Sequence, residues 1–343
     1  MHPWTRPLIT AMVPVALLVA PPTVGAADAV SALATCHGRA ATIVSSTRDG
    51  VRGTNGDDVI VARDSGPVHS LGGDDVICLV GTSARRHEAF GGNGDDRIYV
   101  DSPHLSTLVV LGGGEDLFRG GSGPDIVYAG DHTPDVLERN VVRTGGGADA
   151  VTVRGGSGPA GDDVHLGAGN DAFDVNDAGI VRRVHGGPGT DTLRFPGHSM
   201  TLTVDNSAQR ATSARRTIVD WSSMETFATV GDTTFLGTGK AETLLPYGAV
   251  VRARMGGGAD VVLAQTCSAD VQGGADDDRL SVAAFVGGSG CDQHATFAGG
   301  PGDDVLVGGK GPDVLVGGAG TDRADGGDGT DACSAETVTR CES

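Results

Sequence analysis

Four aspartates recur every nine residues, and each closes a six-residue segment of the pattern Gly-Gly-x-Gly-x-Asp. Glycine adopts positive φ and allows close backbone approach, so this pattern predicts a tight turn. Such a turn presents carbonyl oxygens and one carboxylate, which are ligands for a hard cation. We predict the following metal-ligating residues: Asp304, Asp313, Asp322, Asp331, Gly299, Gly300, Gly302, Gly308, Gly309, Gly311, Gly317, Gly318, Gly320, Gly326, Gly327 and Gly329.

The spacing also predicts that these carboxylates stack. If one turn and one short strand take nine residues, two of each make a coil of eighteen, and Asp322 lies over Asp304. Two carboxylates about 5 Å apart repel by roughly 3 kcal/mol at an effective dielectric near 20, which opposes folding unless a cation separates them. Ca²⁺ tolerates irregular oxygen cages, whereas Mg²⁺ demands octahedral geometry and retains water. We therefore expect Ca²⁺ as the bound metal.

Further copies of the motif lie outside this tandem block. We predict calcium ligands at the aspartates that close four of them, Asp58, Asp96, Asp125 and Asp292. Shortened or altered turns end at Asp75, Asp116, Asp149, Asp171, Asp260 and Glu242, and a full copy ends at Asp191. Turns beginning at 53, 72 and 91 are nineteen residues apart, so we expect these coils to keep one glycine turn each.

Short apolar triplets follow most of the turn aspartates, for example 59–61, 126–128 and 305–307. They are rich in β-branched residues and too short for helices. Each would form a strand of about 10 Å, and stacked coils would lie about 4.8 Å apart. We predict an all-β fold, a parallel β-roll or β-solenoid.

The composition excludes some classes of function. The chain has 343 residues with 57 glycines, 4% aromatic residues and a net charge of −19. Few aromatic residues argue against an ordinary globular core. The acidic balance lacks the basic footprint of a nucleic-acid-binding protein. We expect calcium ions as partners, no nucleic acid and no membrane span, and the sequence identifies no protein or glycan partner.

The N-terminus and the cysteines both indicate export. Arg6, the apolar stretch 8–20 and the small residues 24–26 predict a secretory signal peptide over 1–26. Six cysteines in an exported chain indicate disulfides, with fifteen possible pairings. Because only neighbouring coils of a solenoid touch, we favour Cys36–Cys78, Cys267–Cys291 and Cys333–Cys341. We expect a secreted, extracellular protein.

The glycine-rich turns resemble the nonapeptide repeats of the RTX, or haemolysin-type calcium-binding, family, whose pattern is G-G-x-G-x-D-x-U-x with U large and apolar. The resemblance covers roughly residues 53–333 and is most specific in the tandem block. It implies a right-handed parallel β-roll that holds Ca²⁺ between stacked coils, with the turn aspartates and nearby carbonyls as ligands. Family toxins and proteases usually carry a catalytic or pore-forming region ahead of the repeats, whereas here the repeats begin almost at once.

The repeats divide the chain into seven predicted segments. The stretch 192–236 has no good turn motif, and we expect its polar part, 209–216, to be a loop. The segments are a signal peptide (1–26), an N-terminal cap (27–52), irregular repeats (53–191), an irregular insert or enlarged coil (192–236), degenerate repeats (237–298), tandem repeats (299–333) and a C-terminal cap (334–343).

We predict a secreted calcium-binding β-roll protein whose folding is coupled to extracellular calcium, with no catalytic activity of its own. The ten histidines are scattered and form neither a zinc-helix nor a nucleophile-elbow pattern. Two alternatives stay open. One is a lyase- or epimerase-like enzyme that acts on extracellular polysaccharide from a β-helix. The other is a calcium-dependent adhesin or surface-binding module with 192–235 as its contact.

Overall fold

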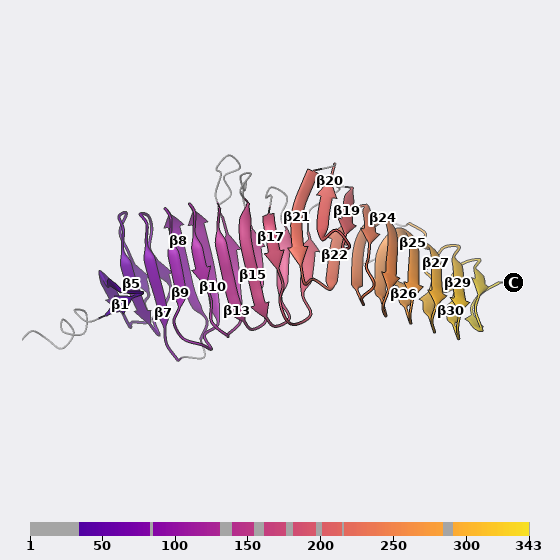
Figure 1. Cartoon of the computed structure of the whole chain (residues 1–343), viewed down its shortest axis with the longest axis horizontal. Coiled ribbons are helices and arrows are strands. Elements are labelled where there is room, and N and C mark those ends of the chain that lie inside the picture. Colours follow the sequence, from indigo (N-terminus) through magenta and orange to yellow (C-terminus); the bar gives the residue numbers. More distant parts are fainter. Residues whose placement is uncertain are drawn as a thin grey trace, which may run out of the picture.

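The chain folds into a rod of stacked β-coils (Figure 1). The computed structural model describes residues 34–82, 85–130, 139–153, 161–175, 181–196, 201–214, 216–283 and 291–342. All regular elements in these ranges are strands, which confirms the all-β prediction. The predicted signal peptide lies outside the described residues.

Two sheets run the length of the rod, and the chain crosses from one to the other twice in each coil. Sheet I consists of β4 (Val51–Arg52), β6 (Val68–His69), β8 (His87–Asn93), β10 (Thr107–Gly113), β12 (Asp125–Ala129), β14 (Ala150–Val153), β16 (Ala172–Val175), β18 (Thr192–Phe195), β22 (Thr226–Val230), the first parts of β24 (Thr243–Gly257) and β25 (Val261–Ala275), β26 (Arg279–Val282), β28 (Val305–Val307), β30 (Arg323–Asp325) and β32 (Thr337–Thr339). Neighbours in this sheet pair in parallel, for example Val109 with Val127.

Sheet II lies opposite. It consists of β3 (Ile43–Ser45), β5 (Val59–Arg63), β7 (Val76–Val80), β9 (Arg97–Val100), β11 (Leu117–Arg119), β13 (Val141–Gly146), β15 (Asp162–Ala168), β17 (Val181–His185), β21 (Arg216–Ser222), β20 (Arg210–Ser213), β19 (Leu202–Asp205), β23 (Thr233–Leu236), the second parts of β24 and β25, β27 (His294–Pro301), β29 (Val314–Ala319) and β31 (Ala332–Ser334). Parallel pairing dominates both sheets, so the parallel β-solenoid is confirmed. Its right-handedness stays a prediction.

Alternation along each short strand places every second side chain between the sheets. In β9 and β11, Ile98 and Phe118 point inward and are fully buried, and they pair in register with each other. Five phenylalanines are among the largest fully buried side chains, namely Phe118, Phe173, Phe227, Phe235 and Phe297. The chain's few aromatic residues are thus concentrated in a narrow interior, which explains how a glycine-rich sequence still forms a core.

The segment predicted as an insert or enlarged coil interrupts sheet II alone. There β20 pairs antiparallel with both β21 and β19, while β21 and β19 pair in parallel with β17 and β23. Sheet I passes the same stretch with β22 between β18 and β24. Sheet II therefore gains strands that sheet I lacks, and the rod changes direction at β19–β21 (Figure 1). The prediction of a loop over 209–216 was wrong, because β20 forms there between two antiparallel partners.

All three favoured disulfides are present: Cys36–Cys78, Cys267–Cys291 and Cys333–Cys341. Near the N-terminus the antiparallel pair β1 (Thr35–Cys36) and β2 (Arg39–Ala40) covers the outer face of sheet II. Cys36 is fully buried there in a small second core with Val61 and Val76. Each bridge therefore joins segments that lie together in the rod, as expected for a solenoid in which only neighbouring coils touch. Within the described residues, no helix has the length and apolarity needed to span a membrane.

Candidate metal centre

The closing aspartates of the stacked turns point into the rod rather than toward solvent. Asp304 is 1% exposed, and its Oδ1 accepts a hydrogen bond of 2.8 Å from the backbone N–H of Asp278 in the preceding coil. Its Oδ2 has no partner. A Cβ on Gly299 would lie 2.2 Å from this oxygen. The first glycine of the motif is therefore required so that the carboxylate can fold back against its own turn.

The other two glycines allow the turns to stack. Gly300 and Gly302 have φ of +126° and +148°, values that favour glycine. A Cβ on Gly300 would approach the carbonyl oxygen of Gly274, in the coil before, to 1.9 Å. These two positions therefore need glycine for two reasons. Their positive φ is avoided by other residues, and neighbouring turns lie too close together to leave room for a side chain.

Stacking arranges the turn residues in two rows, one on each edge of the rod. The N–H of Asp304 donates to Asp322 Oδ1 at 2.9 Å, and that of Asp313 donates to Asp331 Oδ1 at 2.9 Å, which confirms the eighteen-residue stacking. Row 1, at the turns from sheet I to sheet II, contains Asp58, Asp75, Asp96, Asp116, Asn140 and Asp162, and it resumes with Asp313, Asp331 and Glu342. Row 2, at the return turns, contains Asp125, Asp149, Asp171, Asp191, Glu225, Glu242, Asp260, Asp278, Asp304, Asp322 and Glu336.

Most of these buried carboxylates keep one oxygen without a hydrogen-bond partner. Within the described residues the unpartnered row oxygens include the Oδ2 atoms of Asp75, Asp96, Asp125, Asp149, Asp171, Asp191, Asp260, Asp278, Asp304, Asp322 and Asp331. Burying a polar atom without a partner is costly, and burying a charge costs more. Their recurrence along both rows therefore requires a compensating group.

The pKa values follow from this burial. Loss of water raises the pKa of Asp96, Asp125 and Asp260 to about 7 each. It raises those of Asp149 and Asp278 to about 6. Backbone hydrogen bonds lower these values in part, and neighbouring row carboxylates raise them further, as Asp75 does at Asp96. Without a cation, the rows favour protonated acids.

The residues present fit Ca²⁺. The turns offer anionic oxygens that lack partners, set against closely stacked backbone carbonyls, and Ca²⁺ binds both kinds of oxygen in flexible geometry. A bound cation would supply the positive charge that the unpartnered oxygens require and would favour the ionised carboxylates. The residues that would hold it are the row aspartates that keep an unpartnered oxygen, together with the carbonyls of their turns.

Most of the predicted aspartates lie in the two rows, but one does not. The tandem aspartates, Asp96 and Asp125 lie in the rows, and so do the aspartates of the shortened turns, Asp116, Asp149, Asp171 and Asp260. Asp292 is exposed and lies outside both rows, because Ala295 occupies the row 1 position beside Asp313. We therefore omit Asp292 from the proposed ligands.

Row residue Asp278 was not singled out from the sequence. Its turn, 273–278, has Asp276 where the motif has its third glycine, and Asp276 adopts a φ of +78°. Aspartate tolerates this conformation better than most residues. The detectable signal was the Gly-Gly pair five positions before Asp278. Asn140 and Asp162 carry no complete motif of this kind.

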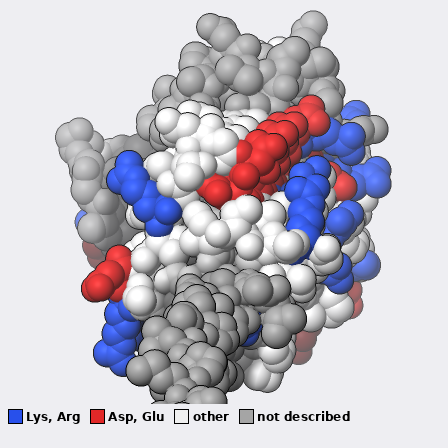
Figure 2. Space-filling model, turned by 90° about the vertical axis from the view of Figure 1, so that its left-hand side faces the viewer, with Lys and Arg blue, Asp and Glu red and all other residues white. Residues whose placement is uncertain are grey.

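An exposed acidic row runs beside row 1. It is formed by the residue before each closing acid: the N–H of Asp74 donates to Asp57 Oδ1, and that of Asp95 donates to Asp74 Oδ1, both at 2.9 Å. Glu115 continues the row by donating its N–H to Asp95 Oδ1. Figure 2 shows acidic side chains in such a row, running away from the viewer along the rod. These carboxylates remain solvated, so they lack the uncompensated burial of the inner rows.

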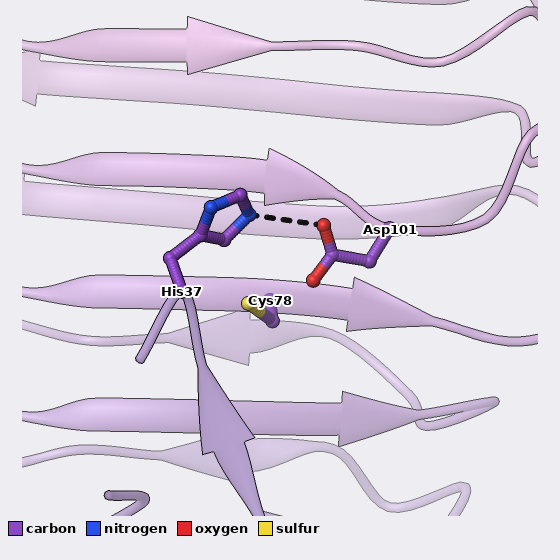
Figure 3. Close-up of side chains that lie close together, drawn as sticks. All are labelled: His37, Cys78 and Asp101. Carbon is purple, nitrogen blue, oxygen red and sulfur yellow. Dashed lines mark hydrogen bonds and ion pairs between the residues drawn. The ribbon is translucent and has the colours of Figure 1, made fainter. Parts of the chain in front are cut away.

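One other group of potential ligands is not a metal site. His37, Cys78 and Asp101 have ligand atoms within 4.8 Å of one another (Figure 3). The Cys78 sulfur is bonded to Cys36, so it is not a thiolate. His37 Nε2 lies 3.1 Å from Asp101 Oδ1, and its ring stacks on Tyr99 at 3.7 Å. This group fastens the N-terminal strands to the first coils.

The fold and its rows define a calcium-binding β-solenoid. The chain carries the RTX calcium-binding nonapeptide repeat, whose family model matches four copies within residues 111–133 and 298–332. This match confirms the resemblance inferred from the turns and Ca²⁺ as the bound metal. No curated protein matches the sequence. Among solved structures, the chain is similar to the X-ray crystal structure of a hyperactive, Ca²⁺-dependent, β-helical antifreeze protein from an Antarctic bacterium, at 18% identity over 87% of this chain and 82% of that chain, with a TM-score of 0.25.

Proposed function

We propose that this protein is a secreted calcium-binding β-solenoid whose folding is coupled to extracellular calcium and which has no catalytic activity of its own. The observation that carries the proposal is the series of buried carboxylate oxygens without partners along both rows. Because the rows form only when the coils stack, calcium bound there stabilises the folded state alone, and its binding energy becomes folding energy.

Secretion is supported by the disulfides, which persist in oxidising compartments. Extracellular calcium is also abundant enough to saturate modules of modest affinity, at dissociation constants of roughly 10⁻⁴ to 10⁻³ M. A chain of this kind would remain expanded during export and fold on meeting calcium. The proposed ligands are the row aspartates that have an unpartnered oxygen. This rule leaves out Asp58 and Asp313, whose Oδ2 atoms accept the backbone N–H groups of Thr54 and Gly309.

The test combines two measurements on the mature protein. Native mass spectrometry during a calcium titration counts the bound ions, and far-UV circular dichroism follows the β-signal at the same concentrations. We expect several ions to bind while the β-signal appears, and magnesium at equal concentration to have little effect. An unchanged β-spectrum with calcium and with EGTA would contradict the coupling.

A second candidate, binding to an acidic surface glycan, is favoured by one observation. Arg119, Arg143, His165 and His185 stand in register on neighbouring strands of sheet II. Arg119 and Arg143 are exposed, and the described residues provide no ion-pair partner for either. An adhesive role predicts calcium-dependent binding to polygalacturonate but not to dextran. An Arg119→Gln/Arg143→Gln variant that binds polygalacturonate as well as the parent protein would remove this candidate.

A further inference from the structure

Two turns have threonine at the position of the motif's second glycine. They are 53–58, with Thr54, and 237–242, with Thr238. In the stacked turns this position has positive φ, as in Gly256 at +111°, a conformation that a β-branched residue avoids. Each threonine turn begins a run of stacked glycine turns, since the first precedes all other acids of row 1 and the second follows the insert in row 2. Neither therefore has to stack on an earlier glycine turn.

In the first of these turns, both oxygens of the closing acid are already bonded. Asp58 Oδ2 accepts the Thr54 N–H at 2.7 Å and the Thr54 hydroxyl at 3.0 Å. Its Oδ1 accepts the Thr42 hydroxyl at 3.2 Å. Asp58 is 6% exposed, so protein donors compensate for the burial of its charge.

The second turn reaches the same result with help from the insert. Glu242, 3% exposed, accepts the Thr238 hydroxyl and the Asn206 Nδ2–H (3.0 Å) at Oε1, and the Thr238 N–H (3.3 Å) at Oε2. Asn206 is itself oriented by the indole N–H of Trp221, which donates to its Oδ1 at 2.9 Å. Trp221 is 3% exposed and packs on Phe227. The insert thus delivers an amide donor to a row carboxylate.

The next acid in each row is different. Asp75 follows Asp58, and Asp260 follows Glu242, and both keep an unpartnered Oδ2. Hydroxyl and amide hydrogens directed at a carboxylate occupy the positions at which a cation would bind and carry partial positive charge, which opposes a cation there. A carboxylate held in this way neither requires nor admits Ca²⁺.

We propose that Thr54 and Thr238 mark turns that close without metal, so that Asp58 and Glu242 are not calcium ligands. Each turn is a calcium-independent start for the calcium-binding turns that follow it. The insert, through Asn206, divides row 2 into two separate calcium arrays, one over Asp125–Asp191 and one beginning at Asp260. This inference rests on the proposed calcium-binding function and specifies where that function is interrupted.

The test counts ions in matched variants by native mass spectrometry at saturating calcium. Glu242→Gln and Asp58→Asn preserve an oxygen acceptor for the threonine donors, so we expect the parental ion count and the parental calcium midpoint. The matched controls Asp260→Asn and Asp75→Asn should each lose at least one ion. The inference is overturned if Glu242→Gln or Asp58→Asn also loses an ion.

Two features keep the test decisive. If Glu242→Gln fails to give the parental β-spectrum in calcium, Asp58→Asn tests the same rule at the other end of the rod. If the parent protein binds no calcium, the proposed function fails, whereas a parent that binds calcium with an ion lost in Asp58→Asn refutes the inference alone.

Discussion

The metal-free protein should become less stable as the pH rises. Asp96, Asp125 and Asp260 have pKa values raised from 3.8 to about 7 by burial. A raised pKa means that the folded state binds more protons than the unfolded state between these values. The stabilising contribution is therefore complete below about pH 4, declines progressively as the pH rises, and is gone above about pH 7. Above pH 7 the protein must either keep these carboxylates buried in the ionised form or unfold.

The size of the effect follows from the shifts. A shift of roughly three pKa units corresponds to about 4 kcal/mol for each carboxyl. Water that enters a loosening turn screens part of this, and we halve it to about 2 kcal/mol each, or about 6 kcal/mol for the three. Such a loss is comparable with the whole stability of a typical domain, roughly 5 to 15 kcal/mol. We expect a folded metal-free rod near pH 4.5 and an unfolded one near pH 8.

Urea denaturation followed by circular dichroism would measure this, on protein freed of metal by a chelating resin. Repeating the denaturation at both pH values in 0.5 M sodium chloride separates the contribution of buried carboxylates from that of exposed ones, because salt screens only the exposed charges effectively. Asp96→Asn should remove about 2 kcal/mol of the pH dependence. With saturating calcium the dependence should reverse, since the metal binds the ionised acids. A metal-free midpoint that is equal or higher at pH 8 would refute the reasoning.

Three further predictions concern the rod itself. Gly300→Ala should lower the stability of the calcium-bound protein by about 2 kcal/mol or more, because Gly300 has a φ of +126° and an added Cβ would lie 1.9 Å from the carbonyl oxygen of Gly274. Gly239→Ala is the control and should change the stability little, because a Cβ there meets nothing within 4 Å. Thermal melting of the two variants measures the difference. Phe173→Ala should cost about 3 to 5 kcal/mol in urea titration, because the ring is fully buried, and a cost below about 1 kcal/mol would contradict its place in the core. Replacing both Cys267 and Cys291 with serine should cost about 3 kcal/mol, estimated from their separation of 24 residues, and an unchanged melting temperature would count against this estimate.

The periodicity of the sequence determined much of the fold because a solenoid is built from local repeats. The Gly-Gly-x-Gly-x-Asp spacing was sufficient to stack Asp304 over Asp322, and cysteine order was sufficient to choose among fifteen pairings. The motif that ends at Asp292 predicted a calcium ligand there, but Asp292 lies three positions before the place where the chain joins row 1. Ala295 occupies that place. The sequence of the turn contains no information on how the chain after it joins the sheet.

The insert was harder to predict for a different reason. Strand β20 depends on antiparallel partners on both sides, and only Ala211 among its residues is fully buried. Its polar composition therefore suggested a loop, and tertiary pairing overrode that local signal. The bond from Asn206 to Glu242 joins residues 36 positions apart, which no nine-residue repeat could indicate.

The two oxygens of most row carboxylates perform separate tasks, and Asn140 demonstrates the separation. Its Oδ1 accepts the N–H of Asp116 at 3.0 Å, and its own N–H donates to Asp162 Oδ1 at 2.7 Å, so the hydrogen-bonded row continues through a neutral residue. One carboxylate oxygen thus connects coil to coil regardless of charge, and the other supplies the charge that calcium requires. A row can therefore lose a charge at single positions while its stacking persists. This separation explains why a chain with so many degenerate turns still forms one continuous solenoid.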